Sequence, residues 1–329
     1  MTANISSMKT TSQEIEQWAA RIQELRDRTL AEVGKVVVGM DDVTHQFLIA
    51  LVASGHVLLE GVPGVAKTTL SKMFARVLGI QYQRLQFTPD LLPSDVTGTY
   101  IFDRKTNEFV LRKGPIFCQV LLADEVNRAP AKTQSALLEA MQENQVTIEG
   151  STLPLPQPFM VLATQNPIEQ EGVYRLPEAQ LDRFLLRVDM GYPQPDREVE
   201  MLYLHSGPVT EPDPVYSAEL ILEIQKRLPE IHGTDALFQY IVNLAEASRN
   251  HPDLALGASP RASLCLLRCA RARALLDGRH YFTHEDVQAV APGVLAHRLI
   301  VRPEAEVEGK HAADVIHELL DTVPVLQTP

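Results

Sequence analysis

Cysteine is scarce in this chain, and long apolar runs are missing. The 329 residues contain three cysteines, an odd number that argues against a disulfide framework and for a reducing compartment. No stretch approaches the roughly 20 apolar residues of a membrane span, and the polar N-terminus lacks the apolar core of a signal peptide. We therefore expect a cytoplasmic protein without a membrane span.

Basic residues are also outnumbered. Thirty Lys and Arg against 42 Asp and Glu give a net charge of -12, so the surface as a whole repels nucleic acid. A local basic patch stays open, but we do not expect nucleic acid to be the main partner. Cys265 and Cys269 have the spacing of a metal pair on an expected helix, yet no His or Cys pair lies near them in sequence, and we interpret them as small buried residues.

The best-defined motif is a phosphate-binding loop, GVPGVAKTT over residues 61–69. An apolar run over 56–60 predicts a buried strand before it, and apolar residues at helical spacing from Leu70 to Leu78 predict a helix after it. Gly61 and Gly64 allow a tight turn whose N–H groups face a phosphate, and Lys67 would reach the β- and γ-phosphates. The expected nucleotide-binding residues of the loop are Gly61, Gly64, Val65, Ala66, Lys67, Thr68 and Thr69.

One position departs from the G-x-x-x-x-G-K-[ST] pattern. Ala66 stands where the pattern has its second glycine, which leaves the match imperfect. A bare turn before a helix is the alternative interpretation, but Lys67 and Thr68 follow at the right spacing. The Thr68 hydroxyl is expected to complete a Mg²⁺ shell otherwise made of waters and phosphate oxygens.

A second apolar strand, residues 119–123, is followed by Asp124 and Glu125. Ligands bind at the carboxyl edge of an open parallel sheet, where these acids would lie. We expect Asp124 to hold the Mg²⁺ shell and Glu125 to orient and deprotonate the attacking water. Alone, such a pair is more often a helix N-cap, and the phosphate-binding loop upstream favours the catalytic interpretation.

Three further positions depend more on context. Asn166 ends a third buried strand over 159–164 and would reach the γ-phosphate or the water, although Asn before Pro is also common in turns. Val38 and Gly39, just upstream of the first strand, are expected to lie near the adenine. Arg183 has no acidic residue at helical spacing other than Asp182, which favours an arginine offered to another subunit.

The strand pattern stops near Pro195, and helical periodicity follows. We therefore predict an N-terminal helical extension (1–34), an α/β nucleotide-binding domain with a parallel sheet flanked by helices (35–192) and a smaller all-α lid (193–329). Two hairpins are expected in the α/β domain, at 100–111 and 145–155, and each is either surface decoration or a contact element. In the lid, Arg261 follows Ser259-Pro260 at a helix start and would point at the nucleotide.

These motifs, in this order, resemble those of the AAA+ ATPases, and more closely those of the MoxR family. The resemblance covers about residues 30 to 325 and is carried by GVPGVAKT (61–68), LQFTPDLLPSD (85–95), DEVNRA (124–129), ATQNP (163–167), LPEAQLDRF (176–184) and VLAHR (294–298). The family resembles this chain at Ala66 as well.

The resemblance implies further roles. Asn166 would be the sensor 1 residue, Arg261 the sensor 2 arginine and Arg183 the arginine finger of a ring, most often of six subunits; Arg128 is an alternative trans-acting arginine. It also implies a Mg²⁺- and ATP-dependent, chaperone-like ATPase that matures a client, often one with a von Willebrand factor A domain. A motor or loader on nucleic acid, a magnesium-chelatase-like subunit and a nucleotide-gated scaffold are the alternatives, and Glu125 disfavours the scaffold.

Overall fold

The computed structural model describes residues 12–62, 64–165, 174, 176–207 and 210–325, and at its centre lies a five-stranded sheet. All neighbouring strands run parallel, in the order β2-β5-β8-β1-β9. The strands are β1 (Val57–Gly61), β2 (Tyr82–Gln86), β5 (Val120–Asp124), β8 (Met160–Gln165) and β9 (Leu186–Met190). The predicted α/β fold with a parallel sheet is confirmed.

Apolar side chains cover both faces of this sheet. Successive residues of a strand point to opposite faces, so Val57 and Leu59 enter one core while Leu58 enters the other. Helices α1 (Ser12–Gly34), α2 (Asp41–Val52) and α3 (Lys67–Val77) pack on the first face, and α4 (Pro93–Thr97) and α5 (Ala131–Glu143) on the second. Burial on both faces explains why β1, β5 and β8 appear as continuous apolar runs in the sequence.

The N-terminal helix α1 is tied to both parts of the molecule. The apolar stripe of this helix is buried, with Trp18 at 8% and Ile22 at 0% exposure. Arg26 on the same helix donates to Asp277 of the C-terminal region at 2.5 Å. The helix therefore braces the C-terminal helices against the sheet domain.

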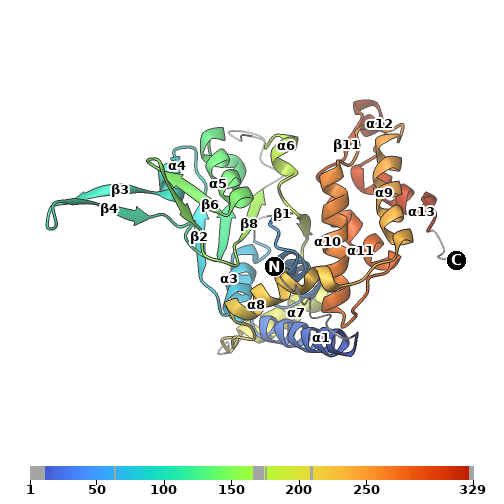
Figure 1. The fold of residues 1–329 in the computed structure, drawn as a ribbon, viewed down its shortest axis with the longest axis horizontal. Coiled ribbons are helices and arrows are strands. Elements are labelled where there is room, and N and C mark those ends of the chain that lie inside the picture. The colour runs from blue at the N-terminus through green and yellow to red at the C-terminus, as the bar shows by residue number, and fades with distance from the viewer. Residues whose placement is uncertain (1–11, 63, 166–173, 175, 208–209, 326–329) are drawn as a thin grey trace, which may run out of the picture.

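Both predicted hairpins are present. Strands β3 (Gly98–Asp103) and β4 (Glu108–Lys113) pair antiparallel and project far from the body, at the left of Figure 1. Strands β6 (Gln145–Ile148) and β7 (Ser151–Pro154) form the second hairpin directly after α5. Both hairpins branch from the same half of the α/β domain (Figure 1).

The C-terminal region is mainly helical, as predicted. Its helices are α6 (Glu178–Leu181) before β9, then α7 (Pro195–His205), α8 (Ala218–Arg227), α9 (Asp235–Arg249), α10 (Pro260–Leu276), α11 (His284–Leu295), α12 (Pro303–Val307) and α13 (Ala312–Thr322). Helices α9, α10, α11 and α13 lie together at the right of Figure 1. We call the part from α9 to α13 the lid. Among the described residues, no helix combines the length and apolar character needed to cross a membrane.

Two details of the lid differ from the expectation of an all-helical domain. Short strands β10 (Leu254–Leu256) and β11 (Ile300–Val301) pair antiparallel, and runs this short carry no period that sequence reasoning can detect. Helix α11 also continues through Pro292, a residue that usually ends a helix, to Leu295. Cys265 and Cys269 are free and buried, as interpreted.

Candidate functional site

The phosphate-binding loop connects β1 to α3, in the order that the sequence predicts. Gly61 packs against β9: a Cβ built there would lie 2.2 Å from the backbone oxygen of Met190, so no larger residue fits without displacing that strand. Gly64 has a φ of +87° with open space around it, and Ala66 has a φ of +59°. The departure at Ala66 therefore places an alanine in the left-handed region that glycine usually occupies.

Lys67 begins α3 and turns back over the loop. Its Nζ donates to the backbone oxygen of Gly61 at 2.5 Å. Burial lowers the pKa of Lys67, while Asp124, Glu125 and Glu60 act in the opposite direction. Among the described residues the ammonium bonds the Gly61 carbonyl, which a phosphate oxygen can replace with a charge-assisted bond.

The loop and the acids share one cavity of about 370 Å³. Eight of its lining residues are predicted from the sequence and three are not. The lining is Gly61, Val62, Gly64, Ala66, Lys67, Thr68, Thr69, Asp124, Glu125, Thr164 and Gln165. We call it the P-loop cavity. Because it lies at the carboxyl ends of β1, β5 and β8, it occupies the edge where open parallel sheets bind ligands.

The Asp124 carboxylate is held on both oxygens. Arg84 of β2 donates to Oδ2 at 2.7 and 3.1 Å, and the Thr164 hydroxyl donates to Oδ1 at 2.7 Å. The same hydroxyl accepts the backbone N–H of Glu125 at 2.8 Å. Thr164 is 1% exposed, so this single hydroxyl fixes the spacing between the two acids.

Glu125 is held by side chains of its own chain. Its Oε2 accepts from Gln86 Nε2 at 2.6 Å and lies 3.0 Å from Arg128 Nε. The backbone of Glu125 has a φ of +56°, a strained conformation for a residue with a side chain. Such strain clusters at functional positions, and here it turns the carboxylate from the strand end into the P-loop cavity.

Sequence reasoning missed Arg84, Gln86 and Thr164. They reach the acids because parallel pairing aligns Gln86 with Asp124 and places β8 on the other side of β5. The available signal was the polar run in β2, whose Arg84 and Gln86 stand near its carboxyl end. Strand order, which the sequence does not state, is needed to connect them with Asp124.

The donor set fits a magnesium–nucleotide complex. Asp124 and Thr68 offer a carboxylate and a hydroxyl in the same cavity, and Mg²⁺ prefers such oxygen ligands. The loop N–H groups, the start of α3 and Lys67 suit a polyphosphate. The Glu125 carboxylate contacts Gln86 and Arg128 through their side chains, so it can turn towards a water by giving up these two contacts.

Of the described residues expected near the nucleotide, Val38, Gly39 and Val65 do not line the P-loop cavity. Asn166 lies outside the described residues. Val65 is 4% exposed and packs in the first core, which leaves only its backbone for phosphate. Gly39 packs against Arg197 of α7, and Val38 precedes it in the turn between α1 and α2. Their contact with adenine stays a prediction.

Arg183 and Arg261 lie in a second cavity, of about 430 Å³. Arg183 follows α6, Arg261 is near the start of α10, and Arg268 and Cys265 also line this space. None of its lining residues lines the P-loop cavity. The structure therefore brings the two predicted arginines together, but away from the P-loop of the same chain. We call this second cavity the arginine cavity.

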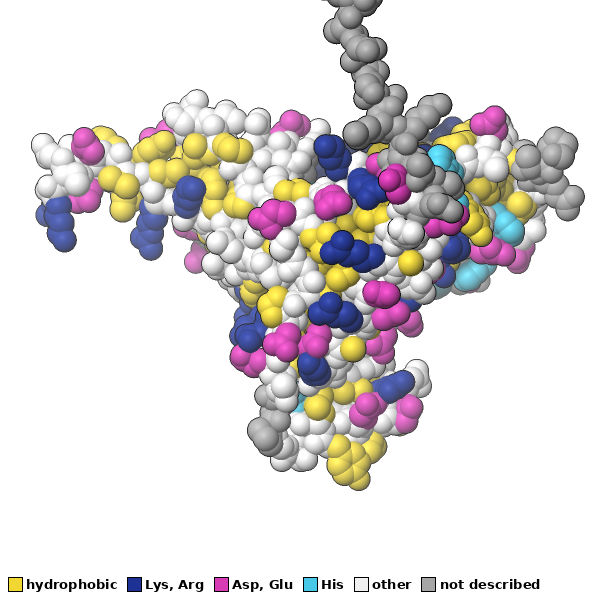
Figure 2. Space-filling model, turned by 60° about the horizontal axis from the view of Figure 1, so that its bottom comes forward, with side chains coloured by type: hydrophobic (Ala, Val, Ile, Leu, Met, Phe, Trp, Pro, Cys, Tyr) yellow, Lys and Arg dark blue, Asp and Glu magenta, His cyan; other side chains and the backbone are white. Residues whose placement is uncertain are grey.

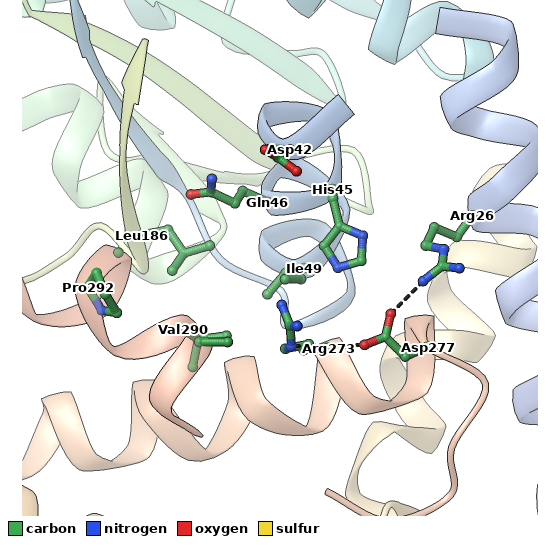
Figure 3. Close-up of a pocket in the computed structure, with 12 residues that line it drawn as sticks. Arg26, Asp42, His45, Gln46, Ile49, Leu186, Arg273, Asp277, Val290 and Pro292 are labelled. Atoms are coloured by element: carbon green, nitrogen blue, oxygen red, sulfur yellow. Dashed lines mark hydrogen bonds and ion pairs between the residues drawn. The ribbon is translucent and has the colours of Figure 1, made fainter. Parts of the chain in front are cut away.

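A third cavity, of about 510 Å³, separates the lid from the sheet domain (Figure 3). Arg26, His45, Arg273 and Asp277 line it, and dashed contacts join Arg26 and Asp277 in the figure. Burial lowers the pKa of His45, whose Nε2 has no partner among the described residues. Two arginines and two aspartates line this cavity, Arg26, Asp42, Arg273 and Asp277, and they come from α1, α2 and the lid. The cavity therefore lies where α2 meets the lid.

Comparison with known proteins agrees with this geometry. Residues 56–186 match the family described as ATPase family associated with various cellular activities (AAA), and residues 246–319 match the AAA lid domain. A parallel sheet with a P-loop, two strand-end acids and a helical lid defines a AAA+ ATPase.

Relatives identify the family within that class. The chain is 46% identical over 306 residues to YeaC, an uncharacterized protein of Bacillus subtilis (92% of this chain, 96% of the relative). It is 45% identical over 318 residues to Chaperone MoxR1 of Mycobacterium tuberculosis (94% and 84%). A crystal structure of an ATPase from Cytophaga hutchinsonii superposes with a TM-score of 0.90 at 40% identity, covering 96% and 99% of the two chains. The chain belongs to the MoxR family of AAA+ ATPases.

Proposed function

We propose that this ATPase works as a Mg²⁺-dependent ring, most simply a hexamer, which uses ATP to remodel or mature a protein client. The observation that supports the ring is the separation of the two cavities. Each chain presents Arg183 and Arg261 away from its own P-loop, so its own nucleotide lacks cations that a neighbouring subunit would supply. In a ring, every arginine cavity meets the P-loop cavity of the next chain.

Within this proposal each residue has one task. Lys67 and the loop N–H groups bind the phosphates, Asp124 and Thr68 hold Mg²⁺, and bound Mg²⁺ supplies charge neutralisation on the phosphates. Glu125 leaves Gln86 and Arg128 to take a proton from the attacking water. Asn166 orients that water.

Arg183 from the next subunit then stabilises the charge that develops on the transferred phosphoryl group, and Arg261 assists it. Arg128 is the weaker candidate for this trans role, because its guanidinium lies 3.0 Å from Glu125 of its own chain.

The β3–β4 hairpin is the proposed client contact. Isolated two-stranded hairpins are marginal in water, yet this one exposes apolar residues on both faces: Ile101 opposite Val110 and Phe102 opposite Phe109, at 44 to 71% exposure. Figure 2 shows hydrophobic side chains along the arm at its left, with Lys and Arg side chains projecting beside them. Exposed apolar surface of this kind fits a contact with another protein.

A von Willebrand factor A domain is the client class that the family resemblance implies. The basic residues of the arm keep the alternative of nucleic acid open to test, because Arg104, Lys105, Arg112 and Lys113 lie on it. DNA that stimulates ATP turnover, with an affinity that falls steeply with salt, would favour that alternative.

The test uses Glu125→Gln, which should bind ATP without hydrolysing it. Immobilised with ATP and Mg²⁺, it should form rings and retain a protein partner from its native lysate, while Lys67→Ala, which lacks the phosphate ligand, should retain nothing. Turnover that survives Lys67→Ala would contradict the assignment of the site.

The trans role is tested by mixing inactive subunits. Arg183→Ala keeps its own P-loop site, and Glu125→Gln keeps its arginines, so a mixture should regain turnover that neither variant shows alone. A mixture as inactive as its components would refute the ring mechanism.

A further inference from the structure

Arg298, at the end of lid helix α11, holds the backbone on both sides of Arg183. Its side chain is 3% exposed and donates from Nη2 to the backbone oxygens of Phe184 (2.6 Å) and Asp182 (3.2 Å) and from Nη1 to that of Leu185 (3.2 Å). Nη1 also donates to the backbone oxygen of Val294. One lid guanidinium thus fixes the residues before and after the trans arginine.

The neighbouring histidine strengthens this attachment. His297 Nε2 lies 3.0 Å from the backbone oxygen of Phe184, and because a carbonyl only accepts, the ring must donate. Arg298 Nη2 also lies 3.5 Å from Cys265 Sγ on α10, the helix that begins beside Arg261. The segment from Asp182 to Leu185 is therefore joined to both lid helices.

Arg298 also binds the carboxylate nearest in sequence to Arg183. Its Nε donates to Asp182 Oδ1 at 2.7 Å, so this acid is already paired. No hydrogen bond or ion pair of the Arg183 side chain is found among the residues that the structure describes, and Arg183 lines the arginine cavity. With Asp182 held by Arg298, the Arg183 guanidinium stays available for a phosphate.

We propose that Arg298 is a positioning residue for Arg183, which aims the arginine at the neighbour's nucleotide and makes it move with the lid. This inference rests on the proposed trans role of Arg183. A purely structural role is the alternative, because breaking a buried ion pair destabilises a fold whatever its function. The two roles differ in which partner subunit restores activity.

The test combines Arg298→Lys with the two inactive variants. Lysine keeps the charge but loses the fork that bonds four backbone oxygens and the Asp182 carboxylate. A misplacement of about 1 Å in a catalytic group can cost about 100-fold in rate, so we expect turnover about 10- to 100-fold lower with unchanged ATP affinity. Mixed with Glu125→Gln, the variant should regain turnover, since its own P-loop site is intact; mixed with Arg183→Ala, it should not.

Arg279→Lys is the matched control. Arg279 also forms a forked ion pair in the lid, at 2.6 and 2.7 Å from Asp286, but touches no residue of the 182–185 segment. It should lower the melting temperature without changing turnover per folded subunit. If Arg298→Lys does not fold, Asp182→Asn replaces it, because the amide weakens only the bond between Arg298 Nε and the Asp182 side chain. We then expect a smaller loss of turnover with the same pattern of rescue.

Two results would overturn the positioning role while leaving the proposed function intact. One is wild-type turnover in Arg298→Lys or, where that variant does not fold, in Asp182→Asn. The other is equal rescue of either variant by Glu125→Gln and Arg183→Ala, or rescue by neither, while Arg183→Ala and Glu125→Gln still rescue each other. If that reference pair shows no rescue, the trans mechanism fails, and the role of Arg298 fails with it.

Discussion

Thr164→Val removes one buried hydroxyl and keeps the shape of the side chain. In the structure this hydroxyl donates to Asp124 Oδ1 at 2.7 Å and accepts from Glu125 N at 2.8 Å. Valine leaves the carboxylate oxygen and the N–H without these partners. The variant therefore separates the role of the hydroxyl from the packing of β8.

The size of the effect follows from the two bonds. A hydrogen bond to a charged group contributes about 1.5–3 kcal/mol, and an unsatisfied buried N–H costs about 1–3 kcal/mol. Asp124 keeps Arg84 on its other oxygen and is 15% exposed, so we take the lower ends and expect about 2.5 kcal/mol in all. At about 2 °C per kcal/mol for a large domain, the melting temperature should fall by about 5 °C.

Turnover should fall further than stability explains, because Glu125 loses the bond that fixes its backbone beside the P-loop cavity. We expect a loss of about 10- to 100-fold in kcat with little change in ATP affinity. Thermal melting and steady-state ATP hydrolysis measure both effects. Thr164→Ser is the control: it keeps the hydroxyl and loses one methyl group, at about 1 kcal/mol. Wild-type behaviour of the valine variant, or equal damage by serine, would refute this reasoning.

Gly61→Ala should distort the loop, because the new Cβ would lie 2.2 Å from the backbone oxygen of Met190. Nucleotide titration should therefore show weakened ATP binding. Unchanged ATP affinity would contradict the close approach. Gln86→Leu removes a donor from Glu125 Oε2 and should raise basal ATP turnover several-fold if Gln86 restrains the base; a fall in rate would show that it orients the base instead. His56 gives a pH effect: burial lowers its pKa from 6.5 to about 4, so the unfolded chain binds the proton first and stability falls as pH drops from 6.5 towards 4. The free energy of unfolding should fall by about 2 kcal/mol at pH 5. The difference in free energy of unfolding between wild type and His56→Gln should therefore narrow by about 2 kcal/mol between pH 7.5 and 5, and a constant difference would contradict this prediction.

The centre of the site could be predicted from sequence because each part has its own local signal. The P-loop glycines, Lys67 and the pair Asp124-Glu125 each follow an apolar run, and runs buried on both faces mark parallel strands without any knowledge of their order. Both hairpins were predictable for a similar reason, since polar turn residues separate alternating segments.

The residues that hold the acids could not be found in this way. Thr164, Gln86 and Arg84 act across strands, and their contacts depend on the order β2-β5-β8 and on a register that pairs Gln86 with Asp124. Strand order follows from how helices pack on the two faces, which is a property of the whole domain. Sequence also could not predict which cavity Arg261 lines, because the angle between the lid and the sheet domain decides where the start of α10 points.

Arg183 lies between two attachments, one to the P-loop strand and one to the lid. On one side, Leu185 N donates to His56 O at 2.8 Å, and β9 then pairs with β1 up to Gly61 of the P-loop. On the other side, Arg298 and His297 bind the same segment from the lid. In the proposed ring, a change in the P-loop strand or in the lid angle would therefore shift the residues around Arg183, and Arg183 would carry that shift to the neighbouring nucleotide. The hydrogen bonds that join the 182–185 segment to the start of β1 and to the lid are what this coupling would use.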